Sequence, residues 1–296
     1  MVVDIHADDY GYTLNTSKEM LSCIDSLDSI SIICNTSYFD ESMELFYQAV
    51  PDMKKLPKLA AHLNIVEGYS YDGSILDKGW GYYFINSFTP KRREIKEAVK
   101  KELKYQIDKV NKACLKCFEL ADKYHIPYSQ RGIRIDSHTH THPVPVVWEA
   151  LCEVIDENEY DIEFIRNPKE PLMPFLREFG LYSTYSLVNF VKNFILNILS
   201  FKIDSYAKSH KLDKVYMCGL VMSGHMDYER LSKVYDAFCA KAERDERYME
   251  FLFHPGKALK SEESPELSRE NMGYFNESDN REIERDAVLR IKPVIE

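Results

Sequence analysis

Short apolar runs alternate along the chain with longer segments in which apolar residues recur at helical spacing. Apolar runs of about four to eight residues predict buried β-strands. We expect strands at Val2–Ala7, Ser29–Cys34, Leu59–Ile65, Ile133–His138, Ile162–Ile165, Val215–Val221 and Glu250–His254. The segments between them predict helices, the first from about Thr16, where Thr16 and Glu19 match a capping box. The others are Asp40–Val50, Pro90–His125, Val144–Asp156, 180–210, Asp227–Ala242 and Arg281–Ile291.

Strands that alternate with helices predict a parallel sheet with right-handed crossovers. We expect an α/β fold of the divergent (β/α) barrel type, TIM-barrel-like, in a single domain over residues 1–296; a doubly wound open sheet is the alternative. The length of 296 residues suits one large domain or two small ones. Residues 66–89 predict a long loop, and 180–215 an insertion or lid over the barrel mouth.

Composition and charge limit the classes of molecule that the chain is expected to bind. Hydrophobic residues are 45% and charged residues 29%, and the formal net charge is −10, which disfavours nucleic acid and anionic membrane as partners. The most apolar stretch, 181–201, is interrupted by Asn and Lys, so it predicts a buried amphipathic helix and no membrane span. No leader peptide is expected, and seven scattered cysteines suggest a reducing, cytoplasmic location. A second copy of the chain, in a homodimer, is a further candidate partner.

The run from Asp136 to His142 carries the clearest chemistry. In an extended strand side chains alternate between faces, so Asp136, His138, His140 and His142 would share one face. Imidazole and carboxylate are the usual ligands of a catalytic divalent metal, and three protein ligands suffice. A solvated histidine-rich loop is the alternative. Three histidines in alternation after an acid favour the metal site.

Further polar residues follow other predicted strands. Asp8 and Asp9 follow the first strand, and a turn there would let both face one cavity. His62 and Asn64 close the third strand, Arg166 follows the fifth and His254 the last. Catalytic groups of (β/α) barrels lie at the carboxyl ends of strands, so these residues are predicted to meet. Trp80, in the loop over 66–89, is a candidate for stacking on a sugar ring; a small aromatic core within the loop is the alternative.

These motifs together resemble the YdjC-like carbohydrate deacetylases, the group that includes chitooligosaccharide deacetylases. The resemblance rests on five pieces in the family's order, which span nearly the whole chain: 7–11 (ADDYG), 62–68 (HLNIVEG), 136–142 (DSHTHTH), 165–166 (IR) and 254–256 (HPG). Tyr10 stands where the family commonly has Phe, and residues 180–215 match nothing in it.

The resemblance implies a hydrolase that removes the N-acetyl group of a small acetylated amino sugar or oligosaccharide and releases acetate. It implies one divalent metal ion held by Asp9, His62 and His138, with His140 as the alternative ligand. Asp8 would be the general base and His254 the general acid, with Arg166 and Asp136 as supports. His140, Asn64 and Trp80 would contact substrate. Two imidazoles suit zinc better than magnesium, and the resemblance leaves Mg²⁺ open.

Two other functions compete with this one. Metal-dependent phosphoesterases and amidohydrolases also use an Asp-x-His-x-His motif. Their motif normally closes the first strand, whereas here it follows about the fourth strand and Asp8-Asp9 follows the first. A non-enzymatic sugar-binding protein on the same fold is the second competitor. A binding protein has no need of a base such as Asp8, so the deacetylase is favoured.

Overall fold

The chain folds around one sheet of seven parallel strands. The computed structural model describes residues 2–268, 272–273 and 279–295. The strand order is β5-β4-β3-β2-β1-β7-β6, with every neighbouring pair parallel. The strands are Val3–Tyr10 (β1), Ser29–Ile32 (β2), Lys58–Leu63 (β3), Ile133–Ser137 (β4), Ile162–Ile165 (β5), Val215–Cys218 (β6) and Tyr248–Phe253 (β7). All seven predicted strands are confirmed, with ends shifted by a few residues.

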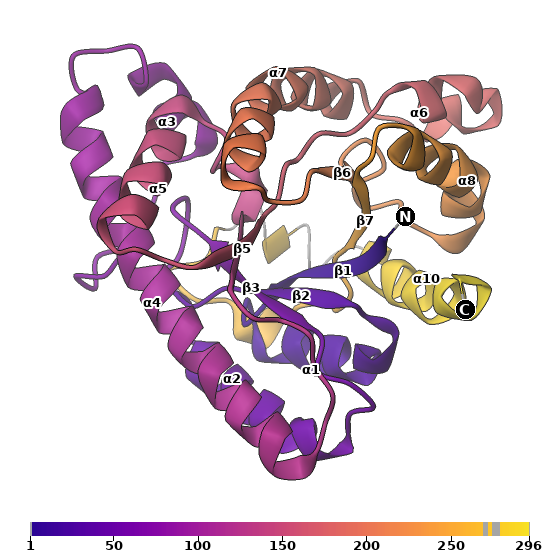
Figure 1. Ribbon diagram of the computed structural model, residues 1–296, viewed down its shortest axis with the longest axis horizontal. Coiled ribbons are helices and arrows are strands. Elements are labelled where there is room, and N and C mark those ends of the chain that lie inside the picture. Colours follow the sequence, from indigo (N-terminus) through magenta and orange to yellow (C-terminus); the bar gives the residue numbers. More distant parts are fainter. Residues whose placement is uncertain (1, 269–271, 274–278, 296) are drawn as a thin grey trace.

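The helices lie outside the curled sheet (Figure 1). They are Leu14–Ser22 (α1), Phe39–Ala49 (α2), Trp80–Asn86 (α3), Arg92–Tyr124 (α4), Pro145–Glu157 (α5), Met173–Arg177 (α6), Leu187–His210 (α7), Tyr228–Arg244 (α8) and Asn280–Ile295 (α10). Short 3₁₀ segments occupy Ile24–Ser26, Val50–Asp52, His138–His140, Phe179–Thr184 and Lys260–Glu262. None of the helices within the described residues has an apolar stretch long enough to span a lipid bilayer.

Two local predictions need correction. The first helix begins earlier than expected, because Thr13 is its N-cap and forms the capping box with Thr16; the predicted box of Thr16 with Glu19 is wrong. The predicted loop over 66–89 contains α3, whose first residue, Trp80, packs its ring on Phe84 at 5.0 Å between centroids. A short helix with its own aromatic contacts gives no long period for a sequence pattern to reveal.

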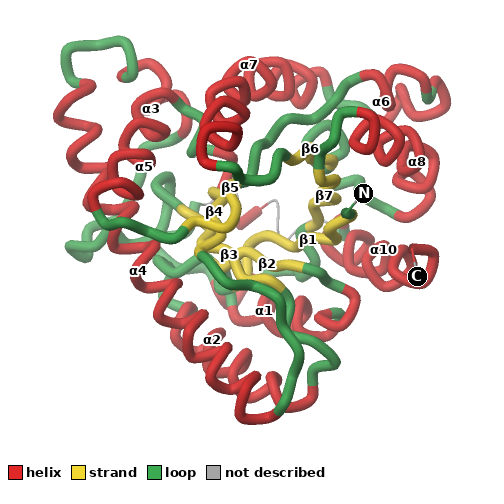
Figure 2. The backbone as a smooth tube through the Cα atoms, in the orientation of Figure 1, coloured by secondary structure: helices red, strands yellow, loops and turns green. Residues whose placement is uncertain are grey.

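The sheet curls so that its edge strands, β5 and β6, approach each other (Figure 2). The amide of Met217 in β6 donates to the carbonyl of Lys169, just after β5, at 3.0 Å. In an open sheet the connection from β5 to β6 would have to cross the whole sheet, whereas in a curled sheet it joins neighbours. The doubly wound alternative is therefore wrong. The observed fold is a seven-stranded, barrel-like α/β sheet, and the described part of the chain does not form the eight paired strands of a full TIM barrel.

Glu170 fastens this junction. Its buried carboxylate accepts hydrogen bonds from the amides of Gly219 (2.7 Å), Leu220 (3.0 Å) and Val221 (3.0 Å), which follow β6. The side chain of Asn193 on α7 donates to it at 2.8 Å. Of the segment 180–215, residues 187–210 form α7, the connection from β5 to β6. One carboxylate thus joins the segment after β5, the segment after β6 and the helix between them.

The interior of the curled sheet is polar. On β1 the side chains of Asp4, His6 and Asp8 alternate with those of Ile5 and Ala7, and all are buried. Contacts between strands that are not neighbours show that the polar set points inward: Asp4, His6 and Asp8 on β1 face Arg134 and Asp136 on β4 and Arg166 after β5. Apolar side chains therefore hold the helices to the outside, while the inside holds a network of charges.

Candidate metal centre

A β-bulge at the end of β1 sets the direction of Asp8 and Asp9. Ala7 pairs with Ile30 and Tyr10 with Ile32, so β1 has one residue more than β2 over this interval. Asp9 takes up the extra residue with φ 73°, a left-handed conformation that costs a non-glycine residue about 1–3 kcal/mol. Without the bulge, adjacent strand residues would point to opposite faces. The bulge lets both carboxylates contact groups inside the sheet. It does what the sequence predicted for a turn at this place, which was to let Asp8 and Asp9 face one cavity.

Three side chains from three strand ends converge above this bulge. The Oδ1 atom of Asp9 lies 2.9 Å from Nδ1 of His138 and 3.3 Å from Nε2 of His62. All three residues are buried, and their ligand atoms lie within 4.8 Å of one another. Ligand atoms bound to one metal ion at ~2.0–2.2 Å stand roughly 3 Å apart, so this donor set fits a divalent ion.

Each of these histidines has its second ring nitrogen held by another carboxylate. His62 Nδ1 lies 2.6 Å from Asp136 Oδ1, and His138 Nε2 lies 2.8 Å from Glu67 Oε1. Such carboxylate–histidine pairs fix the ring orientation and the tautomer of metal-ligating histidines. The second nitrogens are therefore occupied, and the nitrogens that face Asp9 are the ones presented to a metal.

The field at the cluster is strongly negative. Burial alone would lower the pKa of His62, but Asp8 and Asp136 raise it to about 9. At His138, burial alone would likewise lower the pKa, but the charge of Asp9 raises it to about 10. Burial would raise the pKa of Asp9, yet His138 holds it well below the usual range of a carboxyl. Carboxylates that favour a positive charge at this point also favour a bound cation.

The strand β4 ends before its histidines do, which corrects the predicted alternation. β4 stops at Ser137, and residues 138–140 form an irregular turn with φ 51° at Thr139 and 52° at His140. His138, His140 and His142 therefore do not share one face with Asp136. His142 instead contacts the Ser137 hydroxyl at 2.6 Å and the carbonyl oxygen of Arg166 at 2.8 Å, and so ties β4 to the segment after β5.

His140 lies beside the cluster but outside it. Burial, together with the charge of Arg166, lowers the pKa of His140 to about 3, so its ring is neutral. Its Nδ1 atom is buried and has no hydrogen-bond partner within the described residues. Its carbonyl oxygen accepts a hydrogen bond from the indole of Trp80 at 3.3 Å. Of the two histidines that the sequence left as alternatives, His138 is the one that meets Asp9 and His62.

Asp8 is bound by Arg166 below the cluster. The guanidinium donates from Nη1 to Oδ2 and from Nη2 to Oδ1, both at 2.9 Å. Burial raises the pKa of Asp8, but the charges of Arg166 and His62 outweigh it and hold that pKa well below the usual range. Arg166 also contacts Asp136 at 3.0 Å and Glu250 at 2.6 Å. The position of Asp8 is thus fixed by a cation that three carboxylates share.

His254 approaches the cluster from the end of β7. Its side chain is 18% exposed, and its Nδ1 atom lies 3.5 Å from Glu284 Oε2 on α10. The same carboxylate accepts the backbone amide of His254 at 2.6 Å. His254 also helps to lower the pKa of Asp9, so the two groups are electrostatic neighbours. The last strand therefore delivers an imidazole that is accessible and oriented.

Asn64 differs from its predicted role as a substrate contact. Its side chain is fully buried, its Oδ1 faces the amides of Val66 (3.2 Å) and Glu67 (3.3 Å), and its Nδ2 donates to Asn35 at 3.2 Å. The small polar side chain caps the turn after β3, as Asn does in Asx turns. It shapes the loop that carries Glu67 and has no free surface for a sugar.

The sequence did not reveal Glu67, or the buried charged residues His6 and Glu250 beneath the site. Glu67 precedes Gly68, whose φ of 90° and close approach to Asn35 exclude a Cβ, because that atom would lie 2.5 Å from the Asn35 carbonyl oxygen. An acid directly before such a glycine was the available signal. His6 and Glu250 were hidden among apolar neighbours, although the polar–apolar alternation along β1 marks His6 as an inward residue.

A surface hollow of about 900 Å³ lies elsewhere. It is lined by Tyr128, Gln130 and Gly132, which precede β4, and by Tyr160, which precedes β5. These residues lie at the amino ends of the strands, whereas the Asp9 cluster lies at the carboxyl ends. The hollow shares no residue with the cluster.

Comparison with known proteins gives a family match. A family model described as "YdjC-like protein" matches residues 133–290, just over half of the chain. None of the curated proteins matches the chain. Among solved structures, one similar chain is a "putative cellobiose-phosphate cleavage protein" from Enterococcus faecalis V583, with 13% sequence identity and a TM-score of 0.49 over 98% of this chain and 94% of that one.

Proposed function

This chain belongs to the YdjC-like protein family, and from that premise we propose that it is a metal-dependent carbohydrate deacetylase. The reaction adds water across the amide of an N-acetylated amino sugar, breaks the C–N bond and yields acetate and the free amine. The observation that carries the proposal is the meeting of Asp9, His62 and His138 within 4.8 Å, beside a second carboxylate, Asp8, that lies outside this donor set. A metal site with an adjacent carboxylate suits hydrolysis of a poor electrophile.

Asp9, His62 and His138 would hold one divalent ion. When bound, that ion polarises the acetyl carbonyl and lowers the pKa of the attacking water. Asp136 and Glu67 keep the two imidazoles in the ligand orientation through bonds of 2.6 and 2.8 Å. Two imidazoles and one carboxylate favour zinc, cobalt or manganese over magnesium on ligand chemistry, so zinc is the first ion to test.

Asp8 is proposed as the general base that accepts the proton of the attacking water. Its low pKa makes it a weak base, yet it remains ionised and therefore competent at neutral pH. The two Arg166 contacts of 2.9 Å hold both oxygens in place. Oδ1 also contacts Nε2 of His6 at 3.0 Å, so Oδ2 is the oxygen with a second lone pair for the proton. Arg166 and Asp136 then act through Asp8 and His62 as positioning residues.

His254 is proposed as the general acid that protonates the departing amine. Its partial exposure leaves room for a substrate, and Glu284 on its Nδ1 side leaves Nε2 to face the reaction. His140 is proposed as a substrate contact, because it lies beside the cluster and is only partly buried. Its neutral ring can accept a hydrogen bond from a sugar hydroxyl at one nitrogen.

The phosphoesterase alternative needs the Asp-x-His-x-His residues as one ligand set. Asp136 instead contacts His62, Arg166 and Ser31. Together with His138 and His140 it does not form one of the candidate metal groups among the described residues. The deacetylase therefore remains the function that these contacts support best.

The substrate is proposed to be a small N-acetylated sugar or short oligosaccharide, met in the cytoplasm. Trp80 would stack on the sugar face, since its indole bonds to the His140 carbonyl at the edge of the site. Removing that stacking should weaken ground-state binding more than the chemical step. Trp80→Ala should therefore raise KM more than it lowers kcat. If Trp80→Ala lowered kcat and left KM unchanged, Trp80 would not be a residue that binds the sugar.

The test is release of acetate and free amine from a panel of N-acetylated mono- and oligosaccharides. The protein is stripped with a chelator and reloaded with zinc, cobalt, manganese or magnesium in turn, and phosphate release from sugar phosphates is followed in parallel. We expect metal-dependent acetate release and no phosphate release. Phosphate release would favour the competing hydrolase, and full activity of the stripped protein would refute metal dependence. Sugar binding without acetate release across the panel and the metals would indicate a binding protein.

A further inference from the structure

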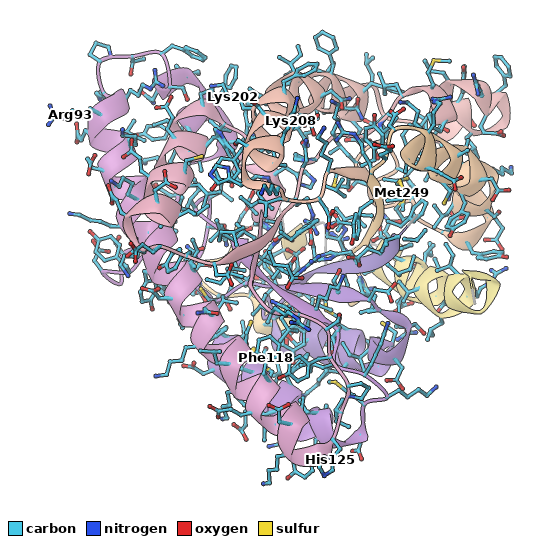
Figure 3. The ribbon with its side chains drawn as sticks, viewed as in Figure 1. Arg93, Phe118, His125, Lys202, Lys208 and Met249 are labelled. Carbon is cyan, nitrogen blue, oxygen red and sulfur yellow. The ribbon has the colours of Figure 1, made fainter. Side chains whose placement is uncertain are left out.

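The outer side of α7 is apolar over most of its length. Six large side chains there are between 52% and 79% exposed: Leu187, Val188, Val191, Phe194, Ile198 and Phe201. From Leu187 to Lys202 the only other exposed residues are Lys192 and Lys202. Figure 1 shows α7 along one edge of the molecule, between α3 and α6. In Figure 3 its outer side chains extend away from the sheet, with Lys202 and Lys208 marking its second half.

The inner side of α7 is unusually polar for a helix that packs against a protein. Asn193 and Asn197 donate to Glu170 at 2.8 and 3.0 Å, and the backbone carbonyl of Ser200 accepts from Asn167 at 3.2 Å. The prediction that the apolar residues of 181–201 are buried is therefore wrong for most of those on α7. A surface helix normally turns its apolar stripe toward the core. Here amide groups share the inner side with Leu196 and Ile203, while six large apolar side chains face outward.

The spacing of the exposed residues is that of a helix–helix contact. Leu187, Val191, Phe194, Ile198 and Phe201 are separated by four, three, four and three residues. This average of 3.5 residues is the a/d repeat of coiled coils, in which a narrow apolar line meets a second helix. We call these five residues the heptad seam. The seam ends at Phe201, because the next positions in the repeat, 205 and 208, are Ser and Lys.

We propose that the heptad seam is the interface between two copies of this chain, packed α7 against α7 in antiparallel orientation. The six exposed side chains offer roughly 600–700 Å² of largely apolar surface, more than a typical monomer exposes in one patch. With a polar rim this reaches about 800 Å² per partner, the size of a stable interface. Antiparallel pairing brings Phe194 close to the twofold axis. It sets Val191 against Ile198 of the partner subunit.

A lipid surface is the less suitable occupant. The net charge of −10 opposes binding to an anionic bilayer. A bilayer also selects a wide apolar face, whereas the seam is one line with a regular 3.5-residue period. Residues of the seam lie outside the Asp9 cluster, so this inference is independent of the proposed reaction.

The test measures the mass of the full-length protein in solution by light scattering and sedimentation over a wide concentration range. We expect a dimer of the 34.6 kDa chain. Phe194→Glu should raise the dimer Kd at least about a hundredfold, because a twofold axis places the charge in the interface twice. Leu115→Glu is the matched control: Leu115 on α4 is 53% exposed, comparable to Phe194 at 61%. It should leave the dimer intact.

A second variant covers the case in which Phe194→Glu fails to fold. Phe194→Cys should form a covalent dimer with a short thiol cross-linker, whereas the wild type, with its own cysteines, should not. A monomeric wild type at all concentrations would overturn the proposal, and so would a Phe194→Glu variant that folds and stays dimeric. A monomer that binds lipid vesicles through this face would assign the seam to a membrane and would equally overturn it.

Discussion

Exchanging Asp8 and Asp9 separately for Asn tests the division of labour between the two adjacent carboxylates. Asp9 contacts both histidines of the donor set at 2.9 and 3.3 Å. Asp8 contacts Arg166 and is not one of the three ligands. We expect Asp9→Asn to lose the metal and Asp8→Asn to keep it while losing turnover.

The magnitudes follow from the contacts. A general base typically contributes ~10²–10⁴-fold to the rate, which corresponds to about 3–5 kcal/mol of transition-state stabilisation. Asp8→Asn should cost less stability than the ~3–5 kcal/mol typical of a broken buried ion pair, because Arg166 keeps Asp136 at 3.0 Å and Glu250 at 2.6 Å as partners. Asp9→Asn replaces a charged ligand with a neutral one. It should weaken metal binding by more than about a hundredfold, since even an outer-shell carboxylate contributes ~10–100-fold.

The assay combines metal content with kinetics. Each variant is equilibrated with zinc, its bound metal is measured by mass spectrometry, and acetate release is then followed at increasing free zinc. Asp9→Asn should regain part of its activity at high zinc, because its deficit is one of affinity. Asp8→Asn should contain one metal per chain at ordinary zinc and stay slow at every concentration.

Two results would refute this reasoning. Equal metal loss in both variants would mean that Asp8 is a ligand. Unchanged turnover in a metal-loaded Asp8→Asn would mean that another group accepts the proton. Circular dichroism and chemical denaturation serve as the control that both variants fold.

Three further outcomes are expected. Glu67→Gln should weaken metal binding ~10–100-fold, because the amide holds Nε2 of His138 less firmly than the carboxylate does; titration with a chromophoric chelator measures this, and an unchanged affinity contradicts the role of Glu67. Glu170→Ala should lower the free energy of unfolding by ~3–5 kcal/mol, since it leaves buried backbone amides without their acceptor. Urea denaturation measures this. A loss under ~1 kcal/mol would mean that Glu170 does not hold the ends of β5 and β6 together. Burial lowers the pKa of His142 from 6.5 to about 4, so the unfolded chain binds this proton more readily, and the metal-free protein should lose up to ~3 kcal/mol of stability as pH falls from 6.5 to 4. His142→Gln should make that slope shallower, and identical slopes in variant and wild type would exclude this contribution.

Much of the architecture followed from local patterns. Apolar runs of strand length located all seven strands, and their alternation with helices indicated a curled parallel sheet. The residues at the strand ends were also found, because parallel strands bring their carboxyl ends together. Asp9, His62 and His138 are far apart in sequence, and the order of the strands is what unites them.

The misses share a physical cause: they depend on backbone geometry or distant contacts. The turn at 138–140 broke a two-residue period that the sequence continues to His142. Asn64 was expected to face substrate, but its buried side chain binds the amides of Val66 and Glu67 through Oδ1 and the side chain of Asn35 through Nδ2. On α7 the repeat of apolar residues was visible, yet nothing in the repeat says whether its partner is the core or a second helix. The contacts of Asn193 and Asn197 with Glu170, and the burial of Leu196 against the sheet, fix which side faces inward.

The charged interior has a consequence for protein engineering. Barrels of this type are usually filled with Val, Ile and Leu, whereas here Arg134, Arg166, His6 and several carboxylates fill the space. Replacing buried ion pairs with well-packed apolar residues often increases stability by ~1–4 kcal/mol. A thermostabilising redesign guided by packing alone would therefore begin at Asp4, Arg134 and Glu250. The redesigned protein would be more stable but inactive, because the same charges orient Asp8 and His62. Directed evolution for heat resistance, selected without an activity screen, should drift toward that outcome.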